Sequence, residues 1–302
     1  MTQPSQDLQG RVAIVTGAGK GLGRAYALHL AARGAAVVVN NRRHPGEGDA
    51  QTSAAQTVAT IVGAGGRATA DWTDVSDPDS GRAMVEHARS TFGGIHIVVA
   101  NAAVASASSF LKQDMAEFRR ILDTGFFGTV YLAHAAWPHL LGQAYGRVIL
   151  TTSSAGLYGD YGIAAYSASK AAIIGFARAL ALEGQGKGVL VNTIAPYAYS
   201  QMTAGHMAPE TVQSFDPALV APLVGWLASE ACTVCGEVLV SGGGLVRRAI
   251  TGETAAVAME SASLARQVQA LRSAPVQSYS SARASFDRFE LELQHHQEAG
   301  TP

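Results

Sequence analysis

The chain has 302 residues, of which 48% are hydrophobic and 15% are charged, and its formal net charge is -1. These proportions exclude a disordered chain, and the near-neutral charge offers no global attraction to nucleic acid or to an anionic membrane. A small-molecule partner is therefore favoured.

The N-terminal and apolar stretches predict a cytoplasmic protein. Met1–Gly10 is polar, with no basic stretch leading into an apolar run, so no signal peptide is expected. The longest apolar stretches, such as Ile95–Ala105, contain polar residues and are too short to span a membrane.

Short runs of β-branched and small residues alternate with longer helical patterns. The predicted strands are Val12–Thr16, Ala36–Asn40, Arg67–Asp71, His96–Ala100, Arg147–Thr152, Val189–Ile194 and Glu237–Val240. Apolar residues recur at helical spacing in Leu22–Arg33, Ala50–Val62, Pro78–Phe92, Met115–Leu141 and Ala164–Leu182. This alternation predicts an α/β fold, a Rossmann-type doubly wound parallel sheet with helices on both faces and a ligand crevice at the carboxyl ends of the strands.

The domain organisation follows from the absence of any repeat or change in composition before about Ile250. We expect residues 1–250 to form one dinucleotide-binding domain that includes the substrate site. Residues 251–302 are expected to form a C-terminal helical extension, with helices at Glu253–Arg272 and Ser281–His295 separated by Ser273–Pro275. A disordered tail is the alternative, because Ser, Ala and Gln are frequent there.

A Gly-rich turn follows the first predicted strand and opens the first helix. Its residues are Gly17, Ala18, Gly19, Lys20, Gly21, Leu22 and Gly23. Glycine permits a tight turn and lets a pyrophosphate approach the helix N-terminus, where free N–H groups favour negative charge. The spacing differs from the common G-x-G-x-x-G pattern, so a purely structural turn is the alternative.

The end of the second strand bears on the choice of nucleotide. Dinucleotide-binding folds commonly place an acid there, but Asn41 is followed by Arg42 and Arg43. Arg42 can hold a 2′-phosphate and Lys20 adds a second positive charge, so NADP(H) is favoured over NAD(H). The alternative is that these cations only solvate a surface loop.

Residues after the third and fourth strands complete the predicted cofactor site. Asp74 and Val75 could contact the adenine. Asn101, Ala102 and Ala103 follow the fourth strand, where small residues let the backbone approach a ligand.

The candidate catalytic residues are Ser153, Tyr166 and Lys170. Ser153 follows the fifth strand, and Tyr166 and Lys170 lie four positions apart, on one face of the next helix. A phenol titrates near pH 10, so a tyrosine base at neutral pH needs its anion favoured by about 4 kcal/mol. An ammonium at about 4 to 6 Å can supply a shift of that sign and size. Ser153 would orient the substrate oxygen and stabilise developing charge.

A Tyr-x-x-x-Lys pair by itself is common on solvated helix faces. Here the Gly-rich turn, Asn101, Ser153 and the Tyr166/Lys170 pair all fall on the carboxyl edge of one predicted sheet. Their agreement favours a site over a solvated face. The C-x-x-C at Cys232 and Cys235 lacks partners of zinc-site spacing among the nine histidines, so we expect no metal there.

These motifs resemble the short-chain dehydrogenase/reductase family over about Gly10–Gly244. They are TGAGKGLG, DVSD at Asp74–Asp77, NAA at Asn101–Ala103, and Ser153 thirteen positions before YSASK. The resemblance implies an NAD(P)-dependent oxidoreductase that interconverts a secondary alcohol and a ketone. It implies that Ser153 orients the substrate, Tyr166 exchanges the proton and Lys170 binds the nicotinamide ribose. It also implies cofactor contacts for Pro196 and Thr203.

Within the family, GLGRAYAL, AAW, SSAGLYGDYG, NTIAP and APLVGWLASEAC resemble the (3R)-hydroxyacyl-CoA dehydrogenase unit of multifunctional enzyme type 2. The favoured substrate is therefore a (3R)-3-hydroxyacyl-CoA. A carbonyl reductase or alcohol dehydrogenase acting on a steroid, cyclic or other apolar ketone is the alternative. A homodimer or homotetramer is expected.

Three positions depart from the family pattern. The family's catalytic Asn falls at Gly125, whose main-chain carbonyl could still hold the water of the proton relay. If it does not, the chain is a dinucleotide-binding module without turnover. Asn41 replaces a cofactor-selecting acid. Tyr197 replaces a common Gly and would narrow a substrate pocket or simply pack its wall, together with Tyr158, Tyr161 and Tyr199.

Overall fold

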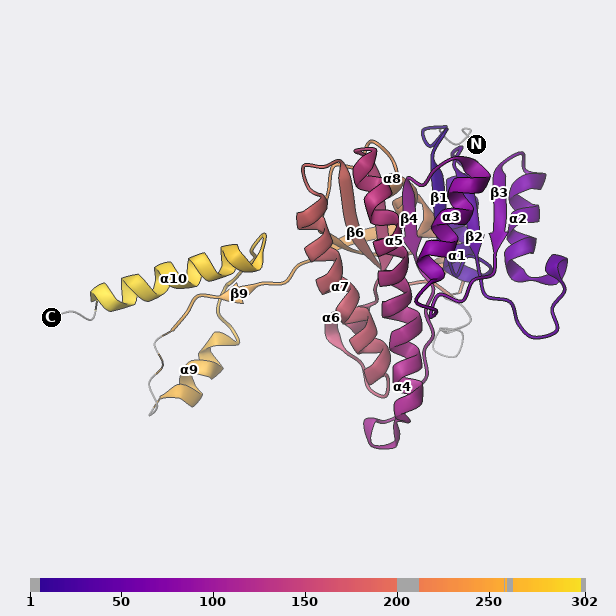
Figure 1. Ribbon diagram of the computed structural model, residues 1–302. Coiled ribbons are helices and arrows are strands. Elements are labelled where there is room, and N and C mark those ends of the chain that lie inside the picture. The colour runs from indigo at the N-terminus through magenta and orange to yellow at the C-terminus, as the bar shows by residue number, and fades with distance from the viewer. Residues whose placement is uncertain (1–5, 200–211, 258, 260–262, 300–302) are drawn as a thin grey trace. The chain divides into compact units, whose positions relative to one another are not determined.

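The structure is a computed structural model that describes residues 6–199, 212–257, 259 and 263–299 (Figure 1). The chain divides into two compact units, Met1–Arg248 and Ala249–Pro302. We describe each unit by itself.

The first unit is built on an eight-stranded sheet with the strand order β3-β2-β1-β4-β5-β6-β7-β8. Neighbouring strands from β3 to β7 pair in parallel. The strands are β1 Val12–Thr16, β2 Ala36–Asn40, β3 Arg67–Asp71, β4 Ile97–Ala100, β5 Gly146–Thr151, β6 Val189–Pro196, β7 Val238–Gly242 and β8 Leu245–Ala249. The first seven confirm the predicted strands to within two residues at each end. β8 was not predicted.

Helices cover both faces of this sheet. The helices named below are α1 Gly21–Ala32, α2 Ser53–Gly63, α3 Ser80–Phe92, α4 Met115–Leu122, α5 Gly128–Gly142, α6 Ser154–Tyr158, α7 Ala164–Gly184 and α8 Ala221–Ala228. One core cluster joins the sheet to α1, α2 and α8, and a second joins it to α3, α5 and α7. Figure 1 shows α3 and α5 in front of the sheet. The predicted Rossmann-type doubly wound fold is confirmed.

Alternate residues of each strand supply the two cores. In β1, Ala13 and Val15 belong to the α1 side, while Val12 and Ile14 belong to the α3 side. All five residues of β1 are buried. A strand buried on both faces reads as a continuous apolar run, and this is why the parallel sheet could be predicted from the sequence.

The predicted helix Met115–Leu141 is interrupted. A π-helical turn, Asp123–Phe127, separates α4 from α5. A π-helical turn contains one residue more than an α-helical turn. The apolar periodicity continues across it, so the sequence gave no sign of the interruption. Gly125, at the position of the family's catalytic Asn, lies within it.

The C-terminal unit is only partly helical. β9 (Glu253–Thr254) pairs in antiparallel with β10 (Val276–Gln277), α9 covers Leu264–Leu271, and α10 covers Ala282–Ala299. The predicted helix Glu253–Arg272 is therefore wrong over its first half. Val276, in the partner strand, packs so close to Gly252 that a Cβ at Gly252 would lie 2.4 Å from Val276 Cγ1.

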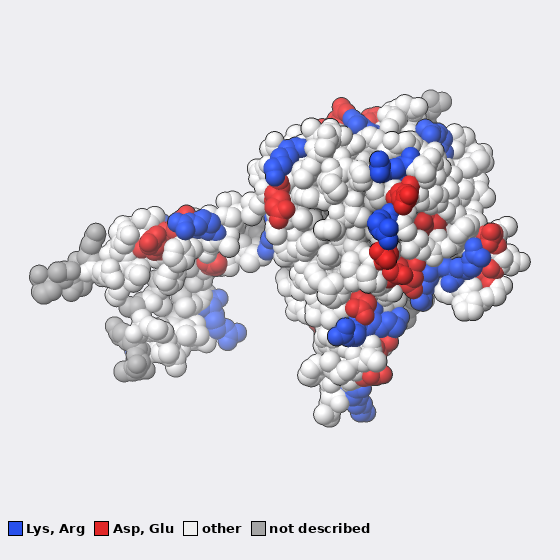
Figure 2. All heavy atoms as spheres, in the orientation of Figure 1, with Lys and Arg blue, Asp and Glu red and all other residues white. Residues whose placement is uncertain are grey.

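Within the described part of the chain, no helix is long and apolar enough to cross a membrane. The described residues also include no group of three or more His, Cys, Asp or Glu side chains that could hold a metal ion. On the face shown in Figure 2, acidic and basic side chains are interspersed.

Candidate active site

The carboxyl ends of β1 and β4 meet at the point where the strand order reverses, which is where doubly wound sheets bind ligands. The backbone N–H groups of Asn101 and Ala102 donate to Thr16 Oγ1, at 3.0 and 3.1 Å. Asn101 Nδ2 donates to the Thr16 carbonyl at 3.1 Å. Asn101 thus clamps the start of the Gly-rich turn, a role that the sequence did not indicate for it or for Thr16.

The Gly-rich turn has the geometry of an anion site. Gly17 has φ +65°, and a Cβ at Gly23 would lie 2.2 Å from the Gly17 carbonyl oxygen, so the turn needs glycine at both positions. Helix α1 begins at Gly21, its N-cap Lys20 makes no side-chain capping bond, and its first turn contains no acid. Its N-terminal N–H groups therefore suit a pyrophosphate.

The loop after β2 holds the two predicted arginines differently. Arg43 pairs with Asp49 at 2.6 Å and lies 4.7 Å from the Trp72 ring centroid. Arg42 is exposed. The side chains of Arg42 and Lys20 make no hydrogen bond or ion pair with any described residue. The Arg42 charge acts on the nearby Asp74 carboxyl, but no direct bond within the described residues holds either side chain away from a phosphate at this end.

Asn41, which replaces the expected acid, is held in place by two hydrogen bonds from its side-chain amide. Its Nδ2 donates to Ser53 Oγ at 3.1 Å and to the Arg42 carbonyl at 3.2 Å. Ser53 was not predicted as a site residue. It starts helix α2, twelve positions after Asn41, and this spacing gave no sign that the two side chains meet.

Asp74 and Val75 behave differently from each other. Val75 is buried, whereas Asp74 is exposed and accepts hydrogen bonds from Ser76 N and Ser76 Oγ at 3.0 and 2.7 Å. Partial burial opposes ionisation of Asp74, but the Ser76 bonds and the Arg42 charge outweigh it and lower the pKa of the carboxyl. Contact of Asp74 and Val75 with an adenine stays a prediction.

The three candidate catalytic side chains come together at the ends of β5 and α7. Ser153 caps α6, its Oγ accepting from Ala155 N at 3.2 Å, and it is hydrogen-bonded to Tyr166. Lys170 is fully buried, and its Nζ donates to the Thr151 carbonyl at 2.7 Å and lies 5.7 Å from the Tyr166 ring centroid. Hydrogen bonds thus join Ser153 to Tyr166 and hold Lys170 to the end of β5.

The electrostatics of this trio differ from our expectation. Burial raises the pKa of Tyr166, and the hydrogen bond with Ser153 lowers it only in part. Burial also lowers the pKa of Lys170 to about 8. In the free protein, therefore, desolvation outweighs the attraction between phenolate and ammonium that we predicted would activate the tyrosine.

The π-helical turn brings Gly125 next to helix α7. A Cβ at Gly125 would lie 2.6 Å from Ser169 Oγ, so Ser169 occupies the space that a longer side chain would need. The Gly125 carbonyl accepts from Thr129 Oγ1 at 3.0 Å. A carbonyl oxygen has two lone pairs, so it can accept more than one hydrogen bond.

The four predicted pocket tyrosines lie on two segments. Tyr158 and Tyr161 are highly exposed near α6, at 76% and 90%. Tyr197 and Tyr199 follow β6, where their N–H groups donate to the carbonyls of Ser241 and Phe215. None of the four makes a ring contact with another among the described residues. Thr203 lies outside the described residues, and Pro196 ends β6.

The C-x-x-C pair takes part in ordinary packing. Cys232 Sγ donates to the Val234 carbonyl at 3.6 Å and Cys235 Sγ to the Ala181 carbonyl at 3.7 Å. Burial raises the pKa of the Cys232 thiol. A buried thiol of raised pKa is a poor nucleophile.

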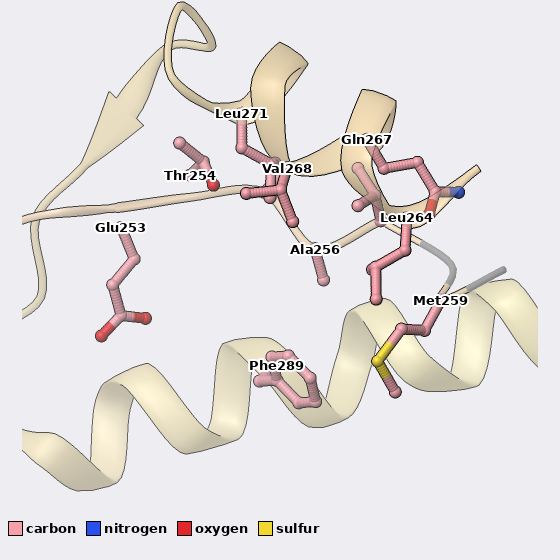
Figure 3. Close-up of a pocket in the computed structure, with 11 residues that line it drawn as sticks. Glu253, Thr254, Ala256, Met259, Leu264, Gln267, Val268, Leu271 and Phe289 are labelled. Atoms are coloured by element: carbon pink, nitrogen blue, oxygen red, sulfur yellow. The ribbon is translucent and has the colours of Figure 1, made fainter. Parts of the chain in front are cut away.

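A separate cavity of about 500 Å³ lies within the C-terminal unit (Figure 3). Apolar side chains from α9, α10 and the segment after β9 dominate its lining. These include Val257, Met259, Leu264, Val268, Leu271 and Phe289. It holds none of the candidate catalytic residues, so the chemistry belongs to the first unit.

The comparisons with known proteins agree with this geometry. Residues 11–210 match the family model for short chain dehydrogenase. A short-chain type dehydrogenase/reductase of Mycobacterium tuberculosis is 40% identical over 80% of this chain and 85% of its own length. The crystal structure of a short chain dehydrogenase from Mycobacterium avium is 35% identical, with a TM-score of 0.80 over 90% of this chain and 98% of that one.

Two further relatives bear on the substrate. Peroxisomal multifunctional enzyme type 2 of Mus musculus is 41% identical over 78% of this chain, which spans only 32% of that enzyme. The 3-oxoacyl-(acyl-carrier-protein) reductase of Escherichia coli is 33% identical over 79% of this chain and 98% of its own length. The chain belongs to the short-chain dehydrogenase/reductase family and is an NAD(P)-dependent oxidoreductase.

Proposed function

We propose that this protein interconverts a (3R)-3-hydroxyacyl-CoA and the corresponding ketone, with Ser153, Tyr166 and Lys170 as its catalytic residues. The observation that carries the reaction class is the trio at the carboxyl end of β5 and the start of α7, with Lys170 buried, at the same edge of the sheet as the Gly-rich turn. The acyl substrate is supported by relatives that include a 3-oxoacyl reductase and multifunctional enzyme type 2. NADP(H) is the favoured cofactor, because Lys20 and Arg42 are exposed cations and Asn41 carries no charge.

The residues at the nucleotide end fit such a cofactor. The uncapped start of α1 would hold the pyrophosphate, and Lys170 would hold the nicotinamide ribose. When bound, the nicotinamide supplies or accepts the hydride, and its oxidised ring adds positive charge to the site. That charge would favour the Tyr166 phenolate, whose pKa burial holds high in the free protein.

The side chains of the chain itself move the proton. In reduction, the Tyr166 hydroxyl donates its proton to the developing alkoxide, and in oxidation the phenolate takes the alcohol proton back. Ser153 hydrogen-bonds the substrate oxygen and stabilises its charge. The Gly125 carbonyl would hold a water that returns the proton from Lys170 to solvent.

A turnover screen tests this proposal. Purified full-length protein is assayed with 3-oxoacyl-CoA thioesters and with free steroid and cyclic ketones, each with NADPH and NADH. Turnover confined to the thioesters would support the acyl assignment, and turnover confined to free ketones would replace it with the carbonyl-reductase alternative. Nucleotide binding without turnover of any ketone would identify a binding module.

The expected dimer or tetramer and the cytoplasmic location stay predictions.

A further inference from the structure

The amide nitrogen of Asn41 has no hydrogen left to offer a ligand. Its two hydrogen bonds go to Ser53 Oγ and the Arg42 carbonyl. A carbonyl can only accept, so the nitrogen and not the oxygen of the carboxamide must face Arg42 O. The carboxamide oxygen, Oδ1, accepts no hydrogen bond from any described residue. Asn41 therefore presents an acceptor and no donor at the nucleotide end of the sheet.

Ser53 is held firmly against the Gly-rich turn. It is the first residue of α2 and is only 8% exposed. A Cβ at Gly19 would lie 2.2 Å from Ser53 Oγ, so the hydroxyl packs directly on the turn. One helical turn later, Thr57 Oγ1 lies 3.3 Å from the Gly19 carbonyl oxygen and 3.1 Å from the Ser53 carbonyl oxygen, and its single hydrogen can serve only one of them at a time. The start of α2 thus packs against the turn that would hold the nucleotide.

We propose that Ser53 is a positioning residue that sets nucleotide choice through Asn41. By accepting from Asn41 Nδ2, it leaves Oδ1 to accept from the ribose 2′-hydroxyl of NAD(H). It also withholds the N–H donor that a 2′-phosphate would take. This inference rests on the nicotinamide cofactor of the proposed function.

The chemistry of the two nucleotides explains why the orientation matters. A 2′-hydroxyl can donate to Oδ1, as it does to the carboxylate that dinucleotide folds commonly place here. A 2′-phosphate offers only acceptor oxygens and is repelled by Oδ1, while Lys20 and Arg42 attract it. The site therefore keeps a usable affinity for NAD(H) although it carries two exposed cations.

Substituting Ser53 tests this role without any turnover. In Ser53→Ala the Asn41 amide loses an acceptor and can turn an N–H towards a phosphate. The dissociation constants of NADPH and NADH are measured by nucleotide fluorescence on the full-length protein. We expect the affinity ratio to move towards NADPH by about three- to tenfold, the net contribution of one ordinary hydrogen bond at a partly exposed site. Ser53→Cys keeps the volume and accepts weakly, so the ratio should move in the same direction.

Two controls separate this role from a general effect on α2. Thr60→Ala removes an exposed hydroxyl from the same helix and should leave the ratio unchanged. In an Asn41→Ala background, Ser53→Ala should no longer move the ratio, because Ser53 acts through Asn41. The role of Ser53 is overturned if Ser53→Ala leaves the NADPH/NADH affinity ratio unchanged. It is also overturned if Ser53→Ala changes that ratio equally in the Asn41→Ala background. Failure of the unmodified protein to bind either nucleotide would overturn the proposed cofactor as well.

Discussion

The two units of the chain bury their apolar side chains to very different extents. In the first unit, Leu132 and Ile173 are fully buried, with 0% exposure. In the C-terminal unit, no described residue is buried, and Phe286 and Phe289 are each 56% exposed. Phe286, Phe289 and Leu293 recur at helical spacing on α10 and stay about half exposed, although Phe289 also lines the cavity beside α9. We therefore expect the first unit to fold on its own contacts and the second to need cover from elsewhere.

The largest expected effect comes from testing whether the chemistry depends on the first unit alone. Tyr166→Phe should lower kcat at least about 1000-fold while nucleotide affinity stays within about threefold, since the phenol carries the proton and little of the binding. Phe289→Ala in the C-terminal unit is the matched aromatic control and should leave single-turnover chemistry intact. Full activity of Tyr166→Phe in steady-state assays would refute the proposed mechanism.

Truncation after Arg248 tests what the second unit is for. We expect its exposed stripe to pack on a second copy of the chain, as large exposed apolar surfaces usually mark interfaces. The truncated protein should then show a smaller mass by light scattering, or lose solubility. Unchanged mass with unchanged solubility would show that the C-terminal unit has no role in assembly.

Paired alanine substitutions compare the two kinds of apolar side chain. Leu132→Ala should lower the free energy of unfolding by about 2–5 kcal/mol because it leaves a cavity in a close-packed core. Leu264→Ala, whose residue is 40% exposed, should cost less than about 1 kcal/mol at a protein concentration low enough to dissociate any oligomer. Equal losses in chemical denaturation would mean that both units are packed alike.

Lys170→Met should stabilise the free protein and destroy its activity. Burial lowers the folded pKa of Lys170 to about 8 from an ordinary value of 10.5, so at pH 7 its charge is held in an unfavourable place. Between these two pKa values the unfolded chain keeps a proton that the folded protein has lost, so stability rises with pH across that window. Removing the charge should add up to about 3 kcal/mol at pH 7, less the lost bond to Thr151, and progressively less towards pH 10.5. Unfolding curves at pH 7 and pH 10 check the sign.

The smallest expected effect concerns nucleotide choice. Exposed charge pairs contribute about 1 kcal/mol or less each, so Arg42→Leu should lower kcat/KM with NADP(H) by about fivefold. Adding Asn41→Asp should reverse the preference towards NAD(H), because an acid repels the 2′-phosphate. A higher kcat/KM with NAD(H) in the unmodified protein, combined with no effect of Arg42→Leu, would contradict the NADP(H) assignment.

The sequence predicted those features that local pattern encodes. Central strands such as β1 and β4 were readable because both of their faces carry apolar residues, and Tyr166 and Lys170 were readable because a four-residue spacing fixes one helix face. The contacts Thr16–Asn101 and Asn41–Ser53 were not readable, since they join residues on different elements. The π-helical turn was hidden because the apolar period runs through it, and β9 was hidden because its partner β10 lies more than twenty residues away.

The pairing of Arg43 with Asp49 and Trp72 has a consequence for binding kinetics. It ties the loop after β2 to itself and to the end of β3 before any nucleotide arrives. A loop that is already ordered loses little conformational entropy on binding, and association does not wait for it to fold. We therefore expect the nucleotide to bind at this end of the sheet in a single fast step, whose rate is limited by diffusional encounter.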